Sequence, residues 1–172
     1  MKLGIETPDR LVDITGLALA DIEWNDGSGA GAPGLRVGAL VRNSDLAADP
    51  VVRSQFPVLS RAVLSGASGQ LRNMATTGGN LFQRTRCPYF MNVDTACNKR
   101  EPGSGCSALD GDRRNAAVLG ASQHCIATHP SDMAVGLAVL DPTVTVVGTD
   151  GVREIRFADL HRLPESAPER DS

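Results

Sequence analysis

The sequence predicts an α+β domain in which helices flank an antiparallel sheet. Two pairs of segments alternate apolar and polar side chains around turns rich in Gly and Asp, which favours hairpins. A Ser-Asp pair also precedes each of two segments with apolar residues at helical spacing, which favours two capped helical regions. Strands and helices in separate runs are typical of an α+β protein rather than of a parallel sheet.

The first strands are expected in the N-terminal quarter of the chain. Residues 10–14 alternate as a half-buried strand does. Residues 19–24 and 34–41 also alternate, on either side of a loop of Gly, Ala, Ser, Asp and Pro. This arrangement predicts an antiparallel hairpin.

The helices are expected after this hairpin and again after a long loop. Ser44-Asp45 can cap a segment in which apolar residues recur at helical spacing from residue 46 to 63, interrupted at Pro57. One or two helices are therefore predicted there. Ser131-Asp132 caps a further predicted helix over residues 133–140.

The C-terminal part of the chain predicts a second hairpin. Residues 143–148 and 152–157 alternate on either side of Thr149-Asp150-Gly151, a turn sequence typical of hairpins. The polar, Pro-containing residues 164–172 are expected to form a frayed tail. Residues 67–125, in contrast, lack any periodic apolar pattern, and a loop of such length is usually functional.

Composition excludes several functional classes. The net charge is −3 without a long run of one sign, which is not the pattern of a broad nucleic-acid surface. The apolar run over residues 133–140 is far shorter than the about 20 residues that span a bilayer. The first ten residues lack the cationic-then-apolar order of a signal peptide, and four cysteines are too few for a disulfide-dense scaffold.

The first candidate binding motif is Ala75-Thr76-Thr77-Gly78-Gly79-Asn80-Leu81. Adjacent glycines let backbone N–H groups approach a phosphate, and the Thr hydroxyls and Asn amide can add hydrogen bonds. A pyrophosphate cradle is one interpretation of the motif, and an ordinary Gly-Gly turn is the other.

The second candidate motif is His129-Pro130-Ser131-Asp132. A helix N-terminus favours an anion, and Ser or Asp can accept a hydrogen bond from a sugar hydroxyl. The alternative is a simple helix cap. His129 has no catalytic partner that the sequence order reveals, so no catalytic residue is predicted.

The third candidate motif is the set of cysteines, Cys87, Cys97, Cys106 and Cys125. Four thiolates suit a tetrahedral zinc ion or an iron–sulfur cluster. Their spacing matches neither the zinc knuckle nor the compact ferredoxin run. An iron–sulfur cluster, a zinc ion, and free or disulfide-bonded cysteines therefore remain open on spacing alone.

Several of these segments together resemble the FAD-binding subunit of molybdenum hydroxylases, which include xanthine dehydrogenase, aldehyde oxidoreductase and carbon monoxide dehydrogenase. Residues 71–81 are similar to the R-N-x-A-T-x-G-G-N-[IL] segment of that family. Residues 35–39 are similar to the strand before its long helix, and residues 130–134 to its S-D-L segment. The resemblance covers essentially the whole chain and is strongest over residues 71–163.

The resemblance implies where the flavin binds. The family's Gly-Gly loop and Ser-Asp pair contact FAD, so that role passes here to Thr76, Thr77, Gly78, Gly79, Asn80, Leu81, Ser131 and Asp132. The fold it implies is the second subdomain of a PCMH-type FAD-binding domain, over residues 1–163, with a cysteine-bearing loop at residues 84–125.

The cysteine-bearing loop resembles one branch of the family, the aldehyde oxidoreductases whose flavin subunit carries an extra 4Fe-4S cluster. The resemblance implies that Cys87, Cys97, Cys106 and Cys125 bind this cluster. Lys99 and Arg100 would then offset its negative charge. A zinc-stabilised binding or scaffold module, and a non-functional remnant, are the competing hypotheses.

The resemblance also implies partners. A large subunit would carry the molybdenum cofactor and oxidise the substrate, and a small subunit would carry 2Fe-2S clusters that reduce FAD on this chain. The assembly would be a heterotrimer or its dimer, cytoplasmic, or periplasmic by export with a partner. Segments that family members carry before residue 1 and after residue 163 lack a counterpart, so we expect a fragment, a mis-assigned start or a degraded gene.

Overall fold

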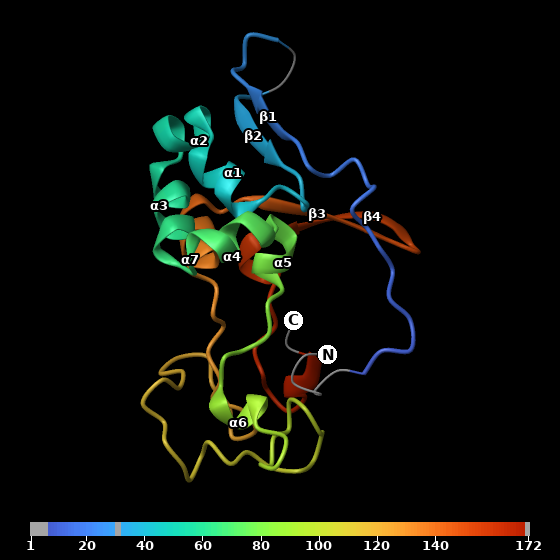
Figure 1. Cartoon of the computed structure of the whole chain (residues 1–172), viewed down its shortest axis with the longest axis vertical. Helices are drawn as coiled ribbons and strands as arrows, with labels where there is room; N and C mark the ends of the chain where they lie inside the picture. The colour runs from blue at the N-terminus through green and yellow to red at the C-terminus, as the bar shows by residue number, and fades with distance from the viewer. Residues whose placement is uncertain (1–6, 30–31, 171–172) are drawn as a thin grey trace. The chain divides into compact units, whose positions relative to one another are not determined.

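The computed structural model describes residues 7–29 and 32–170 (Figure 1). The chain divides into two compact units. We call Val12–Gln83 with Ser131–Leu140 the helical unit, and Met1–Leu11, Arg84–Pro130 and Asp141–Ser172 the cysteine unit. Both helices and antiparallel strands are present, which confirms the α+β prediction.

The helical unit begins with a short hairpin and continues with helices. Strand β1 pairs antiparallel with β2, with Ile22 opposite Val37 and Asn25 opposite Gly34. The bounds of its elements are β1 Ile22–Asn25, β2 Gly34–Val37, α1 Asn43–Ala48, α2 Pro50–Gln55, α3 Pro57–Ser65, α4 Gly69–Met74, α5 Thr77–Leu81 and α7 Asp132–Leu140.

Prolines explain why the predicted one or two helices are three, α1, α2 and α3. Pro50 and Pro57 each occupy the first turn of a new helix, where the missing N–H is tolerated. Asp49 caps α2, because its Oδ1 accepts hydrogen bonds from the N–H groups of Val51 and Val52, both at 2.9 Å. Ser44 and Asp45 lie inside α1 rather than at its cap, so that detail of the prediction is wrong.

The core of the helical unit forms where α3 packs against α7 and α1 (Figure 1). Leu46, Leu59, Val63 and Met133 are buried there. At Gly136 a Cβ would lie 2.9 Å from the Cβ of Ala62, so the close approach of α7 to α3 requires a small residue. This packing fixes the N-terminal end of α7.

The cysteine unit contains little regular structure. Its elements are α6 Pro88–Met91, β3 Thr143–Gly148, β4 Gly151–Arg156 and two short 3-10 turns, η1 Phe157–Asp159 and η2 Pro168–Arg170. The second hairpin is confirmed: β3 pairs antiparallel with β4, and Gly148 lies opposite Gly151. Gly151 has φ +106°, a conformation that favours glycine.

Three expectations about the fold differ from the structure. Residues 10–14 form no strand, and Leu11 and Val12 are exposed. The sheet is not continuous, because the described strands form two separate two-stranded sheets. In the expected tail, Pro164 and Pro168 are buried, and the Pro168 carbonyl accepts a hydrogen bond from Lys99 Nζ.

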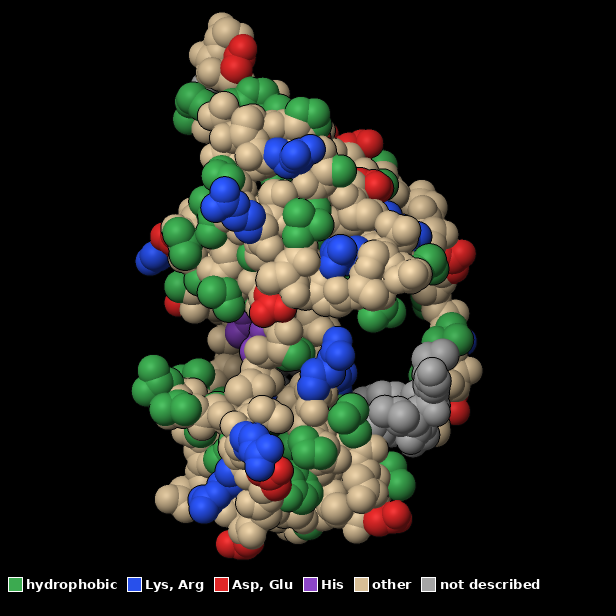
Figure 2. Space-filling model, turned by 60° about the vertical axis from the view of Figure 1, so that its left-hand side comes forward, with side chains coloured by type: hydrophobic (Ala, Val, Ile, Leu, Met, Phe, Trp, Pro, Cys, Tyr) green, Lys and Arg blue, Asp and Glu red, His purple; other side chains and the backbone are tan. Residues whose placement is uncertain are grey.

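The surface agrees with the mixed charges of the sequence. On the face drawn in Figure 2, Lys and Arg side chains lie scattered among acidic and apolar ones. None of the helices in the described part of the chain is long and apolar enough to cross a bilayer.

Candidate functional site

The Gly-Gly motif forms the short helix α5. Thr76 caps this helix, since its Oγ1 accepts a hydrogen bond from Gly79 N at 3.2 Å. Thr77 is buried, and both its N–H and its hydroxyl donate to the Val41 carbonyl, at 2.9 and 3.2 Å. The start of α5 is thus tied to the segment that follows β2.

The glycines of this motif serve a close approach within the chain. A Cβ at Gly78 would lie 3.1 Å from the Ala39 Cβ and 3.2 Å from the Ala39 carbonyl oxygen. Gly78 N donates to that carbonyl at 2.8 Å, and Asn80 N donates to Thr76 O at 2.8 Å. The N–H groups of residues 77–80 therefore all have acceptors inside the protein. These bonds shape the motif, and its contact with a phosphate stays a prediction.

Asn80 joins this motif to the Ser-Asp motif. Its Oδ1 accepts a hydrogen bond from Ser131 Oγ at 2.6 Å and from Gln83 Nε2 at 3.0 Å. Ser131 is 3% exposed, and its Oγ also accepts from Ala134 N at 2.9 Å, which confirms the predicted cap of α7. Two motifs 51 residues apart therefore meet at one end of the helical unit.

The groups at this end of the helical unit suit a polar, partly anionic ligand. Gly79 and Asp132 are exposed, and Thr76 and Asn80 are half-buried. The N-terminus of α7 carries a partial positive charge, while the Asp132 carboxylate can accept hydrogen bonds from sugar hydroxyls. Hydroxyl, amide and carboxylate groups around small residues therefore fit the polar portions of FAD.

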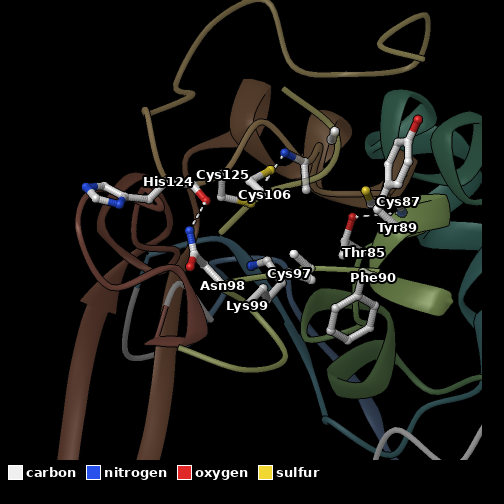
Figure 3. Close-up of a pocket in the computed structure, with 13 residues that line it drawn as sticks. Thr85, Cys87, Tyr89, Phe90, Cys97, Asn98, Lys99, Cys106, His124 and Cys125 are labelled. Atoms are coloured by element: carbon white, nitrogen blue, oxygen red, sulfur yellow. Dashed lines mark hydrogen bonds between the residues drawn. The ribbon is translucent and has the colours of Figure 1, made fainter. Parts of the chain in front are cut away.

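All four cysteines line one cavity in the cysteine unit (Figure 3). None of the four forms a disulfide bond, and Cys97 and Cys125 are buried. Apart from Lys99 and His124, the other lining residues are apolar or uncharged. The full lining consists of Thr85, Cys87, Tyr89, Phe90, Ala96, Cys97, Asn98, Lys99, Cys106, Ala108, His124, Cys125 and Ala127. The structure thus brings together the four predicted metal ligands.

Four thiols suit either of the metal centres that the sequence left open. Among the described residues, no three His, Cys, Asp or Glu side chains stand close enough to hold a single metal ion. In a zinc site all four sulfurs lie about 2.3 Å from one ion, whereas each thiolate of a 4Fe-4S cluster binds a different iron and lies further from the others. Four thiols around one cavity are the donor set of either centre.

The cavity itself is narrow. Its volume is about 10 Å³, roughly the room of one water molecule. The loops must therefore move apart when a larger group is inserted. The donor chemistry of four cysteine thiols, rather than the present volume, is what suits a metal centre.

The backbone N–H groups of three of the cysteines donate hydrogen bonds to nearby hydroxyl side chains. Cys87 N donates to Thr85 Oγ1 at 3.2 Å, and Thr85 Oγ1 donates in turn to Thr128 O at 3.1 Å. Cys97 N donates to Ser104 Oγ at 3.0 Å, and Cys125 N donates to Ser122 Oγ at 3.2 Å. The loop is thus ordered by short polar side chains in place of regular secondary structure.

Cys97 and Cys106 face each other across an isolated antiparallel bridge. Ser107 N donates to Ala96 O at 3.0 Å, and Gly103 and Gly105 have φ +86° and +99° in the turn between the two cysteines. Such φ values favour glycine, so these glycines permit the turn that returns Cys106 to Cys97.

The two basic residues predicted near the cysteines differ in position. Lys99 lines the cavity, is 7% exposed, and donates to Pro168 O at 3.1 Å. Arg100 donates instead to the carbonyls of Tyr89 and Phe90 at 2.9 and 2.8 Å, and does not line the cavity. Arg100 therefore orders the chain after Cys87.

Sequence reasoning missed Asn98. This residue is buried and its amide contacts the backbone next to two other cysteines. An Asn in a loop ordinarily indicates a turn, so only its position directly after Cys97 could have drawn attention to it.

Comparison with known proteins identifies the family to which this chain belongs. A model of the family described as the FAD binding domain in molybdopterin dehydrogenase matches residues 1–171. The chain is 57% identical over 169 residues to the aldehyde oxidoreductase FAD-binding subunit PaoB of Escherichia coli (strain K12), covering 98% of this chain and 52% of that protein.

More distant relatives match shorter stretches. The chain is 32% identical over 98 residues to the glyceraldehyde dehydrogenase medium chain of Sulfolobus acidocaldarius, covering 57% of this chain and 33% of that protein. It is 31% identical over 81 residues to the carbon monoxide dehydrogenase medium chain of Hydrogenophaga pseudoflava, covering 47% of this chain and 26% of that protein. The chain spans about half the length of the E. coli relative and less of the others.

Proposed function

This chain belongs to the family of FAD-binding domains in molybdopterin dehydrogenases, and from this we propose that it is the FAD-binding electron-transfer subunit of a molybdenum-containing oxidoreductase of the aldehyde type. The match over residues 1–171 carries the proposal. Identity of 57% to an aldehyde oxidoreductase subunit favours the aldehyde type over the xanthine type. The family resemblance drawn from residues 71–81 is confirmed.

The helical unit is proposed to bind FAD where α5 meets α7. The ligand residues are Thr76, Thr77, Gly78, Gly79, Asn80, Leu81, Ser131 and Asp132. When bound, FAD supplies the redox chemistry, and the protein supplies position and polarity.

Within this site the residues divide their roles by burial and bonding. Asn80 and Ser131 hold the two motifs together through their 2.6 Å hydrogen bond. Gly78 lets α5 approach Ala39, and exposed Gly79 leaves room for a ligand beside the cap residue Thr76. Asp132 offers its carboxylate from the first turn of α7, where a hydroxyl group of a ligand can donate to it.

The cysteine unit is proposed to bind a 4Fe-4S cluster through Cys87, Cys97, Cys106 and Cys125. The supporting observation is that all four line one cavity and that none of them forms a disulfide bond. Such a cluster supplies one-electron transfer when bound. Lys99, in the cavity wall, places positive charge beside the thiolates.

The wider assembly is proposed by analogy with the multisubunit relatives. The chain is proposed to receive electrons from 2Fe-2S clusters on a small partner subunit and to deliver them to an acceptor, while a large subunit with the molybdenum cofactor oxidises the substrate. The complex is a heterotrimer or its dimer, in the cytoplasm or exported to the periplasm with a partner. Residues 1–163 are the proposed PCMH-type FAD-binding domain.

Reduction of bound flavin tests this function. The full chain, purified anaerobically, is titrated with FAD, and the flavin absorption and fluorescence report binding. The complex with its partner subunits is then mixed with an aldehyde, and bleaching of the flavin band is expected. A chain that binds no FAD in both settings would contradict the proposal.

A further inference from the structure

Asn98 lies directly after Cys97 and is buried, with 8% of its surface exposed. Its side chain is an amide, which carries a donor and an acceptor on one rigid plane. We infer that Asn98 is the positioning residue that holds together the backbone segments of three of the four cysteines, Cys97, Cys106 and Cys125. The inference rests on the proposed function, because it concerns the same cysteine site.

Two hydrogen bonds carry the inference. Asn98 Nδ2 donates to the carbonyl of His124, the residue before Cys125, at 3.0 Å (Figure 3). Asn98 Oδ1 accepts from the N–H of Gly105, the residue before Cys106, at 2.8 Å. One side chain therefore joins the backbones beside Cys97, Cys106 and Cys125.

The surrounding chain explains why this link matters. His124 lies 26 residues after Asn98 in the sequence. The segment around it, residues 122–127, contains no helix or strand. The turn between Cys97 and Cys106 has its own bridge, through Ala96 and Ser107. The amide of Asn98 adds a connection from this turn to the segment that contains Cys125.

The burial of Asn98 makes the amide chemistry specific. Aspartate could still accept from Gly105 N, but its second oxygen would face the His124 carbonyl with no proton to donate. A buried polar group left without its partner destabilises its surroundings, and water cannot readily replace the lost donor. Loss of the donor alone should therefore release the Cys125 segment.

Asn98 acts through the ligands, since it supplies no thiolate. Partners that orient metal ligands typically change metal affinity by about 10- to 100-fold when they are removed. The cysteine site should respond in iron retention and in the spectroscopic signature of the cluster. Flavin binding by the helical unit should not change.

The test compares Asn98→Asp with Asn92→Asp in the full chain, purified and loaded with iron and sulfide anaerobically. Asn92 is exposed in the same unit, and its Oδ1 accepts from Asp94 N at 3.0 Å, a bond that Asp can keep. The two variants thus add the same charge. Iron release to a chelator, the electron paramagnetic resonance spectrum of the reduced cluster, and bound FAD are measured for each.

We expect Asn98→Asp to release iron at least about tenfold faster than wild type, in line with the loss of a ligand-orienting partner. Its resonance spectrum should be altered, while FAD per chain stays equal to that of wild type. Asn92→Asp should match wild type in all three. Iron release and a spectrum from Asn98→Asp equal to those of Asn92→Asp would overturn the inference.

A second variant keeps the test decisive if Asn98→Asp does not fold. Asn98→Leu is close to Asn in size and removes both the donor and the acceptor. A folded Asn98→Leu with faster iron release and an altered spectrum supports the inference, and one indistinguishable from wild type overturns it. Wild-type chain that takes up no iron would instead contradict the proposed cluster, and the inference with it.

Discussion

The helical unit and the cysteine unit order their backbones in different ways. In the helical unit, packed helices satisfy most backbone groups, and buried side chains such as Leu46 and Met133 share the stabilisation. In the cysteine unit, individual side chains such as Thr85, Asn98 and Ser122 hold an irregular loop. Single polar substitutions should therefore affect the cysteine site strongly and the flavin site weakly.

The largest expected effect is the loss of iron from the cysteine unit while flavin stays bound to the helical unit. Cys97→Ser removes one of four proposed cluster ligands, and iron should fall from about four per chain to near zero, since a 4Fe-4S cluster uses four thiolates. Flavin content should stay largely intact because the flavin residues lie in the helical unit. Iron and flavin analysis of the purified full chain checks this. Equal loss of both cofactors would mean that the loop supports the whole fold.

A core substitution in the helical unit provides the reverse experiment. Leu46 on α1 is 1% exposed, and Leu46→Ala should lower the free energy of unfolding by about 2–5 kcal/mol, through lost burial and a cavity. Flavin content should fall while iron content is retained. Urea unfolding followed by circular dichroism measures the first effect. Exposed Leu71→Ala on α4 is the control and should cost far less.

Removal of the Arg100 guanidinium should act on the cysteine unit alone. Arg100→Met keeps most of the stem but leaves the Phe90 carbonyl without this donor, at a cost of about 1–3 kcal/mol. Iron release to a chelator should quicken, and FAD binding should not change. Arg113→Met removes the same charge from an exposed position in the same unit. Similar iron release from both variants would show that charge, rather than the hydrogen bonds, is responsible.

The smallest expected effect lies at the flavin site. Ser131→Ala removes the cap of α7 and the bond to Asn80, at a cost of about 1 kcal/mol. FAD affinity should weaken roughly fivefold, as 1.4 kcal/mol corresponds to tenfold. Fluorescence titration with FAD measures this, with Ser65→Ala at the end of α3 as the control. An unchanged affinity would indicate that the link between the two motifs is not needed for binding.

Local signals in the sequence predicted much of the fold. The Asp-Gly turn identified the hairpin of β3 and β4, and the Ser131 cap identified α7. The strand predicted over residues 10–14 is wrong, because an alternating pattern forms a strand only where a partner strand can pair with it. Pro50 was overlooked as a helix start, although it divides α1 from α2.

The candidate sites were predictable only in part. The sequence offered a phosphate cradle or an ordinary turn for Gly78, and the structure adds a close approach to Ala39 that no local pattern reveals. Cysteine spacing left zinc and a cluster equally open, because the turns that bring Cys87 and Cys125 to one cavity are irregular. Asn98 was missed for the same reason.

Metal analysis of the anaerobically purified full chain tests the central claim most directly. The account predicts about four iron atoms per chain, acid-labile sulfide in equal amount, and no stoichiometric zinc, as a 4Fe-4S cluster on four cysteines requires. Zinc at about one atom per chain without iron would instead indicate a structural zinc site of the Cys₄ type and contradict the account.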